Sequence, residues 1–145
     1  MTREFPDKPL VGVGAVIVKN DRVLLIKRGQ APLLGEWSLP GGVLECGETL
    51  REAVTREVCE ETSLTVEPVE MLGVYERVIR TDDGRVRYHY VLIDYLCRPV
   101  AGTTRAATDA AEAAWFTKDE LPALKLPPDT TEVVLKGLAC ASAWR

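Results

Sequence analysis

Residues 49–62 read TLREAVTREVCEET, and this stretch has the features of one amphipathic helix with a defined start. Thr49 followed by Glu52 forms a capping box, in which the hydroxyl and the carboxylate each bind a backbone N–H group that the helix leaves unpaired. The residues that recur every four positions and form an apolar stripe are Leu50, Val54 and Val58. The sequence therefore predicts a helix that begins after Thr49 and ends near Thr62.

The same helix concentrates negative charge on one side, at Glu57, Glu60 and Glu61. Like charges three or four residues apart share a helix face and destabilise the helix by roughly 0.2–0.5 kcal/mol per pair. This charged face lies beside the apolar stripe, so we expect the carboxylates at the rim of a cleft. For REVCEE (residues 56–61) taken alone, a solvated acidic face is the more common explanation, and a bound cation is the alternative.

The neighbouring residues supply the other groups that a cation site needs. A hard divalent ion such as Mg²⁺ takes a few carboxylates and fills its remaining positions with water and substrate phosphates. Arg56 can pair with Glu48 and hold the preceding loop against the helix. Gly41 and Gly42 allow the backbone to approach a metal or a phosphate closely.

Strand and helix patterns on both sides of this helix predict an α/β domain. The predicted strands are Val11–Lys19, Arg22–Arg28, Val69–Arg80, Arg85–Arg98 and Glu112–Phe116. The other predicted elements are a loop at Gly29–Glu36, a short helix opened by the capping box Thr117–Glu120, and a final helix at about Thr130–Ala143. This order predicts a mixed sheet covered by helices, in α/β/α layers and within one domain, residues 1–145.

Composition narrows the class of protein. The 145 residues suit a single domain, and the net charge of −4 gives no reason to expect tight binding to nucleic acid or to an anionic membrane. No apolar run is long enough to span a bilayer. The four cysteines form no CxxC pair, and no secretory signal is recognised, so we expect reduced thiols and a cytoplasmic location.

Residues 42–64, GVLECGETLREAVTREVCEETSL, resemble the signature box of the Nudix hydrolases. That pattern is Gly, five residues, Glu, seven residues, Arg-Glu, an aliphatic residue, any residue, Glu-Glu, any residue, Gly and an aliphatic residue. The positions that match it are Gly42, Glu48, Arg56, Glu57, Val58, Glu60, Glu61 and Leu64. Ser63 stands where the pattern has its second glycine, so we expect a slightly different helix terminus with the chemistry retained.

The resemblance implies a Nudix-type α/β/α sandwich with a mixed sheet, and hydrolysis of a nucleoside diphosphate linked to another moiety. It also implies Mg²⁺, or Mn²⁺ in its place, as the cofactor. The implied metal ligands are Glu57 and Glu61, with Glu60 and the Gly41 carbonyl as further ligands. Glu48 and Arg56 orient the site by the same analogy. The implied general base is Glu57 within the box or Glu112 outside it.

Three further residues have an ordinary explanation beside a functional one. Arg28, at the end of a strand, is either a solvated arginine or a phosphate contact. His89 either fills space in its strand or contacts a base or ribose. Glu112 is as well explained by a surface carboxylate as by a ligand or base. Gly42 is the third candidate for substrate contact, through its backbone.

The segments around the box resemble small bacterial-type Nudix proteins often assigned to ADP-ribose. We therefore expect ADP-ribose or a related nucleotide sugar as the small-molecule partner. One alternative is a pyrophosphohydrolase of normal or oxidised nucleoside triphosphates. Another is a non-catalytic sensor of a nucleotide metabolite, against which the intact acidic residues of the box argue. Similar proteins are frequently homodimers, so a homodimer is the assembly that the resemblance implies.

Overall fold

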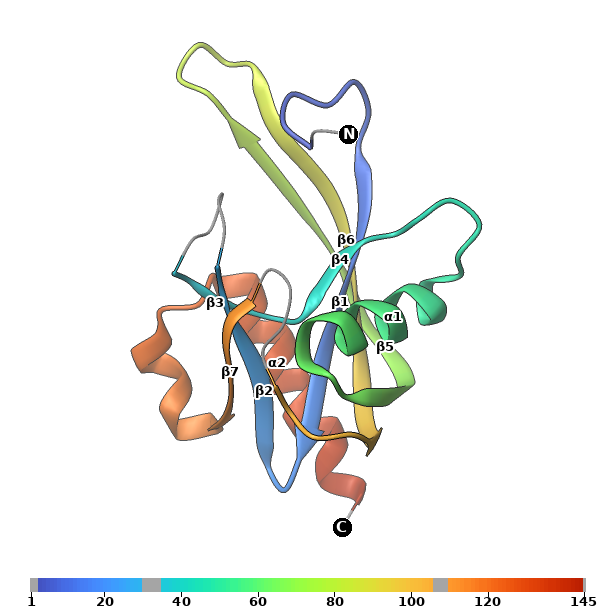
Figure 1. Cartoon of the computed structure of the whole chain (residues 1–145). Coiled ribbons are helices and arrows are strands. Elements are labelled where there is room, and N and C mark those ends of the chain that lie inside the picture. The colour runs from blue at the N-terminus through green and yellow to red at the C-terminus, as the bar shows by residue number, and fades with distance from the viewer. Residues whose placement is uncertain (1–2, 30–34, 106–109, 145) are drawn as a thin grey trace.

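The computed structural model describes residues 3–29, 35–105 and 110–144, and within them a mixed sheet lies between helices (Figure 1). The strands are β1 (Leu10–Lys19), β2 (Arg22–Arg28), β3 (Trp37–Ser38), β4 (Gly41–Val43), β5 (Thr65–Arg80), β6 (Val86–Ala101) and β7 (Ala110–Thr117). The helices are α1 (Leu50–Thr62), α2 (Pro128–Ala141) and the 3₁₀ helices η1 (Lys118–Leu124) and η2 (Ser142–Trp144). The predicted α/β/α layering is confirmed.

The sheet is mixed because β1 runs parallel to β6, whereas the other strand pairs are antiparallel. The strand order is β3-β2-β1-β6-β5, with β7 beside β2 and β4 beside β1. β1 pairs with β2 only over Ile17–Lys19, and β4 takes the same edge at Gly12–Gly14. This exchange of partners along β1 brings β4 next to α1.

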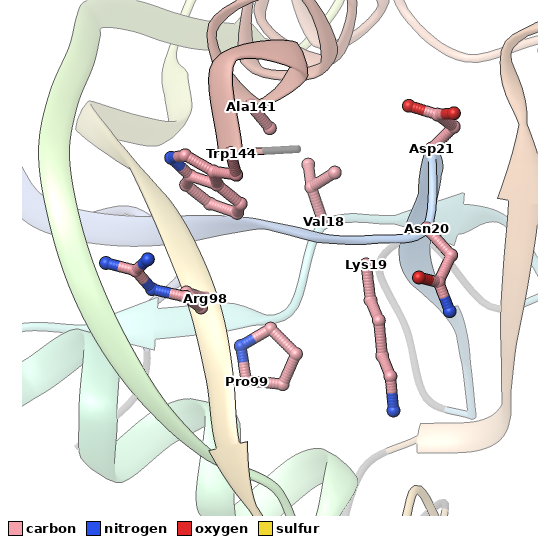
Figure 2. Close-up of a pocket in the computed structure, with 8 residues that line it drawn as sticks. All are labelled: Val18, Lys19, Asn20, Asp21, Arg98, Pro99, Ala141 and Trp144. Carbon is pink, nitrogen blue, oxygen red and sulfur yellow. The ribbon is translucent and has the colours of Figure 1, made fainter.

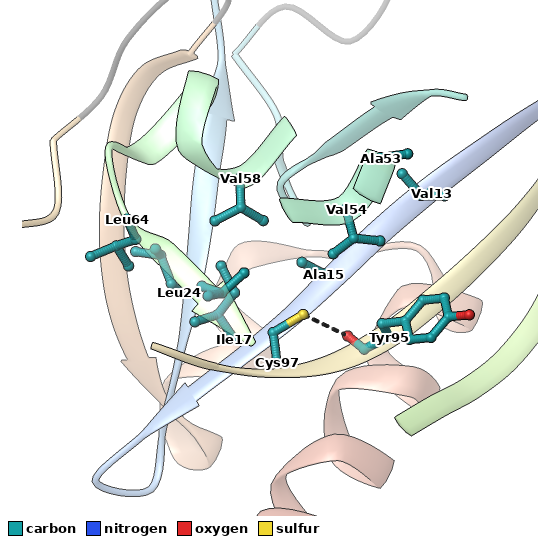
Figure 3. Close-up of a cluster of buried hydrophobic side chains, with 11 residues drawn as sticks. Val13, Ala15, Ile17, Leu24, Ala53, Val54, Val58, Leu64, Tyr95 and Cys97 are labelled. Atoms are coloured by element: carbon teal, nitrogen blue, oxygen red, sulfur yellow. Dashed lines mark hydrogen bonds between the residues drawn. The ribbon is translucent and has the colours of Figure 1, made fainter. Parts of the chain in front are cut away.

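Alternating residues of β1 supply two hydrophobic cores, one on each face of the sheet. Val13, Ala15 and Ile17 pack under α1 with Val54 and Val58, as Figure 3 shows. Val16 and Val18 face α2 on the other side. Burying each such aliphatic side chain stabilises the fold by about 1.5–3 kcal/mol. The apolar stripe predicted from the sequence is therefore the surface that holds α1, and its glutamates, in place.

Several element boundaries differ from the prediction. β5 begins at Thr65 instead of Val69, and register shifts near Val66 and Pro68 keep this irregular start paired with β6. β3 and β4 were not predicted, because strands of two and three residues are too short to show an alternating pattern.

Residues 30–34 of the predicted loop lie outside the described part. None of the described helices has both the length and the apolar composition that a bilayer crossing requires.

The expectation of a different helix terminus at Ser63 is wrong. Ser63 has φ 67° and ψ 8°, the left-handed conformation that the pattern's glycine would take, and its N–H donates to the carbonyl of Cys59. For a residue with a side chain, this left-handed conformation costs roughly 1–2 kcal/mol. The buried packing of Val58 before Ser63 and of Leu64 after it keeps the backbone in that conformation. The helix therefore ends in the usual way despite the serine.

Replacing Ser63 with glycine should raise the free energy of unfolding by about 0.5–1 kcal/mol, because glycine relieves the left-handed strain but loses more entropy on folding. Urea unfolding monitored by circular dichroism would measure the change. Ser63→Val, which adds a β-branched side chain at the same φ, should destabilise the protein. Equal stabilities for the three proteins would show that Ser63 is not strained.

Candidate active site

Two glycines of β4 lie directly against the glutamates of α1. The N–H group of Gly41 donates a hydrogen bond of 2.9 Å to Oε1 of Glu61, whose residue is only 3% exposed. A Cβ atom on Gly42 would overlap the carboxylate of Glu57 and force that carboxylate to move. Glycine at both positions therefore lets the β4 backbone form one wall of an acidic site.

Arg56 is the centre of this acidic site and joins carboxylates from the loop and the helix. Its Nε and Nη2 atoms donate to the two oxygens of Glu48 at 2.7 and 2.9 Å, a bidentate pair. Its Nη1 atom lies 2.9 Å from Glu57 and 3.4 Å from Glu60, and Nη2 also donates to the Val43 carbonyl. The predicted pairing of Arg56 with Glu48 is confirmed, and it ties the loop to the helix.

Two of the carboxylates bound to Arg56, those of Glu48 and Glu57, have different electrostatic surroundings. Hydrogen bonds from Arg56, and from the backbone N–H of Glu45, lower the pKa of Glu48 to about 2. Burial raises the pKa of Glu57, although Arg56 opposes that effect. A carboxylate that burial makes costly to ionise gains from an added cation and accepts a proton more readily than an exposed one. Glu57 is thus the more basic of the two.

The carboxylate and backbone oxygens of this site are suited to a hard divalent cation, but the described side chains alone do not surround one. Among residues 3–29, 35–105 and 110–144, no three Asp, Glu, His or Cys side chains stand in a metal-binding arrangement. Mg²⁺ needs only one or two carboxylates, since water and substrate phosphates complete its octahedron. Partly buried carboxylate oxygens beside a glycine backbone are donors of that kind.

The other predicted residues occupy different places. Arg28 ends β2, and its Nε atom is buried without a hydrogen-bond partner among the described residues. Glu112 lies on β7, where strand alternation turns it to the face away from α1, and it pairs with Lys27 at 3.6 Å. His89 lies on β6 opposite Val78 of β5. The structure thus brings the box residues together and separates Glu112 from them.

Comparisons with known proteins agree with this arrangement. The NUDIX domain model matches residues 8–136 of the chain. The chain belongs to the NUDIX domain family, the Nudix hydrolases. The box at residues 42–64 is therefore the Nudix box of this chain, and the resemblance seen in the sequence is confirmed.

Two relatives and one solved structure show how this Nudix chain compares with others. It is 41% identical over 116 residues to the ADP-ribose pyrophosphatase of Methanocaldococcus jannaschii. That alignment covers 80% of this chain and 66% of the Methanocaldococcus protein. It is 37% identical over 108 residues to the 8-oxo-dGDP phosphatase NUDT18 of Mus musculus, covering 72% of this chain and 31% of that one. The crystal structure of a MutT NUDIX hydrolase from Burkholderia pseudomallei matches 90% of this chain and 98% of its own, with a TM-score of 0.78 and 35% identity. The Nudix fold is thereby established.

A cavity of about 120 Å³ lies on the α2 side of the Nudix sheet, lined in part by Ser38, Tyr75 and Asp94. Asp94 is 7% exposed, and burial raises its pKa to about 6. The charge of Asp129 adds to this rise and Arg77 opposes it, while Arg77 itself pairs with both Asp129 oxygens at 2.7–2.8 Å. Sequence reasoning missed Asp94, although an acid within the apolar run VLIDYLC was a visible signal.

Replacing Asp94 with asparagine should stabilise the protein near neutral pH. The pKa of Asp94 in the folded protein lies above its ordinary value of 3.8, so the folded state favours the protonated carboxyl. The stability that protonated Asp94 contributes is therefore fully present below about pH 4 and is lost as the pH rises through about 6. At about pH 7.5 the neutral amide should raise the free energy of unfolding by on the order of 2 kcal/mol. Urea unfolding at about pH 3.5 should show little gain. An equal gain at both pH values, or the same gain for the exposed Asp82→Asn, would contradict this account.

A larger hollow, of about 540 Å³, lies at the β1–β2 turn near the C-terminus (Figure 2). Lys19, Arg98 and Trp144 contribute to its wall, with Arg98 stacked over the Trp144 ring. Figure 1 shows this turn at the end of the sheet remote from the β5–β6 hairpin tip, below α1. The hollow contains none of the box residues, so the candidate active site remains at α1 and β4.

Proposed function

We propose that the chain is a cytoplasmic, divalent-metal-dependent pyrophosphohydrolase that cleaves the diphosphate linkage of ADP-ribose or a related nucleotide sugar. The observation that supports this most directly is the contact of Gly41 and Gly42 with Glu61 and Glu57 inside a Nudix box. That contact supports the proposal because carboxylate oxygens are the ligands that a hard divalent cation prefers, and a glycine backbone leaves room beside them.

In this proposal each box residue has its own task. Glu57, Glu60, Glu61 and the Gly41 carbonyl hold Mg²⁺, or Mn²⁺ in its place. When bound, the ion would neutralise phosphate charge and activate water for attack on phosphorus. Glu57, whose pKa burial raises, would act as the proton acceptor, and Arg56 with Glu48 fixes the direction of its carboxylate. Glu112 is the less favoured base because it faces the other side of the sheet.

The choice of substrate rests on the relatives. The Methanocaldococcus relative is named an ADP-ribose pyrophosphatase, which favours the nucleotide sugar. A second candidate is hydrolysis of oxidised nucleotides, favoured by the NUDT18 relative, which is named an 8-oxo-dGDP phosphatase. The non-catalytic sensor is less favoured because Glu57, Glu60 and Glu61 are all retained.

A substrate panel with Mg²⁺, Mn²⁺ or EDTA, read by chromatography of the products, tests the proposal. Metal-dependent release of AMP and ribose 5-phosphate from ADP-ribose, well above all other compounds, is the expected result. Release of pyrophosphate from a triphosphate, or of phosphate from an oxidised diphosphate, would support the hydrolase activity but show that the substrate is not a nucleotide sugar. A folded protein with no turnover on any compound would favour the sensor.

The proposed partners are a small-molecule nucleotide and a second copy of the chain. Nucleic acid is not an expected partner at a net charge of −4. Light scattering coupled to size-exclusion chromatography would distinguish the homodimer from a monomer of 16.0 kDa.

A further inference from the structure

Asp94 of β6 places a carboxylate in the interior of the fold without a hydrogen-bond partner. Only 7% of this residue is exposed, and no side chain or backbone group in the described part of the chain donates a hydrogen bond to its carboxylate. The residue lines the cavity of about 120 Å³ on the α2 side of the sheet. Because buried side-chain oxygens nearly always have a hydrogen-bond partner, we expect a molecule in this cavity to supply the donor.

The nearest cation does not neutralise Asp94, because it is bound to a different acid. Nη2 of Arg77 donates to both carboxylate oxygens of Asp129, at 2.8 and 2.7 Å. This ion pair joins β5 to α2 and satisfies the charge of Asp129. Asp94 is therefore the acceptor in the cavity wall that remains available to a ligand.

A glycine keeps room for this carboxylate and links it to the acidic site. Gly14 of β1 pairs with Asp94, and an added Cβ atom would overlap Oδ1 of Asp94. On its other edge Gly14 pairs with Gly41 of β4, whose N–H binds Glu61. Two strand spacings, roughly 10 Å, therefore separate Asp94 from the β4 backbone. A nucleotide, whose ribose stands between base and phosphates, can span such a separation.

The walls of the cavity suit a nucleobase. Leu39, Leu92 and Tyr75 provide apolar surface, and Asp94 provides an acceptor beside it. Apolar walls with a few placed polar groups are typical of sites for small organic molecules. A nucleobase is flat, and adenine carries an exocyclic amino group that donates hydrogen bonds; carboxylates accept such bonds from the amino group of cytosine. The cavity therefore matches an amino-bearing base better than a base that presents a carbonyl.

We propose that Asp94 binds the exocyclic amino group of the substrate's nucleobase, adenine in ADP-ribose, and so determines which nucleotides the chain accepts. The inference rests on the proposed function for the diphosphate, but it concerns the opposite end of the substrate. It also explains why the chain retains a carboxylate that we expect to lower its stability near neutral pH.

The test compares Asp94→Asn with the matched control Asp82→Asn, the same change at an exposed acid between β5 and β6. Each protein is assayed on ADP-ribose and on its hypoxanthine counterpart, in which a carbonyl replaces the amino group. For the wild type and Asp82→Asn, kcat/KM should be at least about tenfold higher for ADP-ribose. In Asp94→Asn this ratio should fall to about one or below, because an amide also donates to a carbonyl.

An unchanged ratio in Asp94→Asn, or a wild type that hydrolyses both compounds equally, would overturn the proposal about Asp94 and leave the hydrolase function intact. If the wild type hydrolyses neither, the proposed function fails. Binding of adenosine and inosine in EDTA, measured by ligand-observed NMR, then decides about Asp94, since neither compound needs a metal. Adenosine binding at least about fivefold weaker in Asp94→Asn than in Asp82→Asn would support the site, and equal or absent binding would overturn it.

Discussion

Replacement of Glu57 by glutamine is expected to lower kcat by about 10²–10³-fold and to leave the fold unchanged. Glu57 is partly buried against Gly42 and bound by Arg56, so the amide keeps its shape and volume in that position. What it loses is the negative charge that holds a divalent cation and accepts a proton. Losing several kcal/mol of transition-state stabilisation corresponds to this drop in rate.

The measurement is turnover at saturating substrate over a series of Mg²⁺ concentrations, with circular dichroism as the check of the fold. Glu132→Gln on α2, which removes an exposed carboxylate from the other side of the molecule, is the matched control and should keep the wild-type rate. If the Glu57→Gln protein folds and keeps the wild-type kcat, Glu57 is not a catalytic residue of the site. A lost rate that excess Mg²⁺ restores fully would limit its role to metal affinity.

Replacement of Arg56 by glutamine should have the largest effect on stability. The guanidinium joins Glu48, Glu57 and Glu60, and its side chain is only 24% exposed. Without it, carboxylates held close together by the fold repel one another. Removing one partner of a buried ion pair costs about 3–5 kcal/mol, and for this partly exposed site we expect about 2 kcal/mol.

The same change predicts an unusual response to metal. Because the unneutralised glutamates should gain more from a divalent ion, Mg²⁺ should raise the Tm of Arg56→Gln by more than it raises that of the wild type. Differential scanning calorimetry with Mg²⁺ and with EDTA would measure both shifts. The exposed Arg22→Gln is the control for removing a positive charge. Unchanged stability together with an unchanged Mg²⁺ response would contradict the role given to Arg56.

The local parts of the site could be predicted from the sequence. The capping box at Thr49, the apolar stripe and the spacing of the glutamates are set by residues within four positions of one another. The Arg56–Glu48 pair spans only eight positions and was also expected. β4 could not be predicted, because its three residues gain their conformation from pairing with β1 and not from their own pattern.

The sequence by itself determined α1 and its acidic face, because helix periodicity and capping are short-range effects. The spacing of the box residues also carried the resemblance to the Nudix family that the match over residues 8–136 confirmed. Only the tertiary structure decided which backbone meets those glutamates, which face Glu112 takes, and that Ser63 adopts the left-handed helix end. It also placed Asp94, a residue distant in sequence from the box, in a cavity wall. The surroundings of Asp94 depend on strand pairing and on burial between layers, and both arise from contacts between segments that no local pattern records.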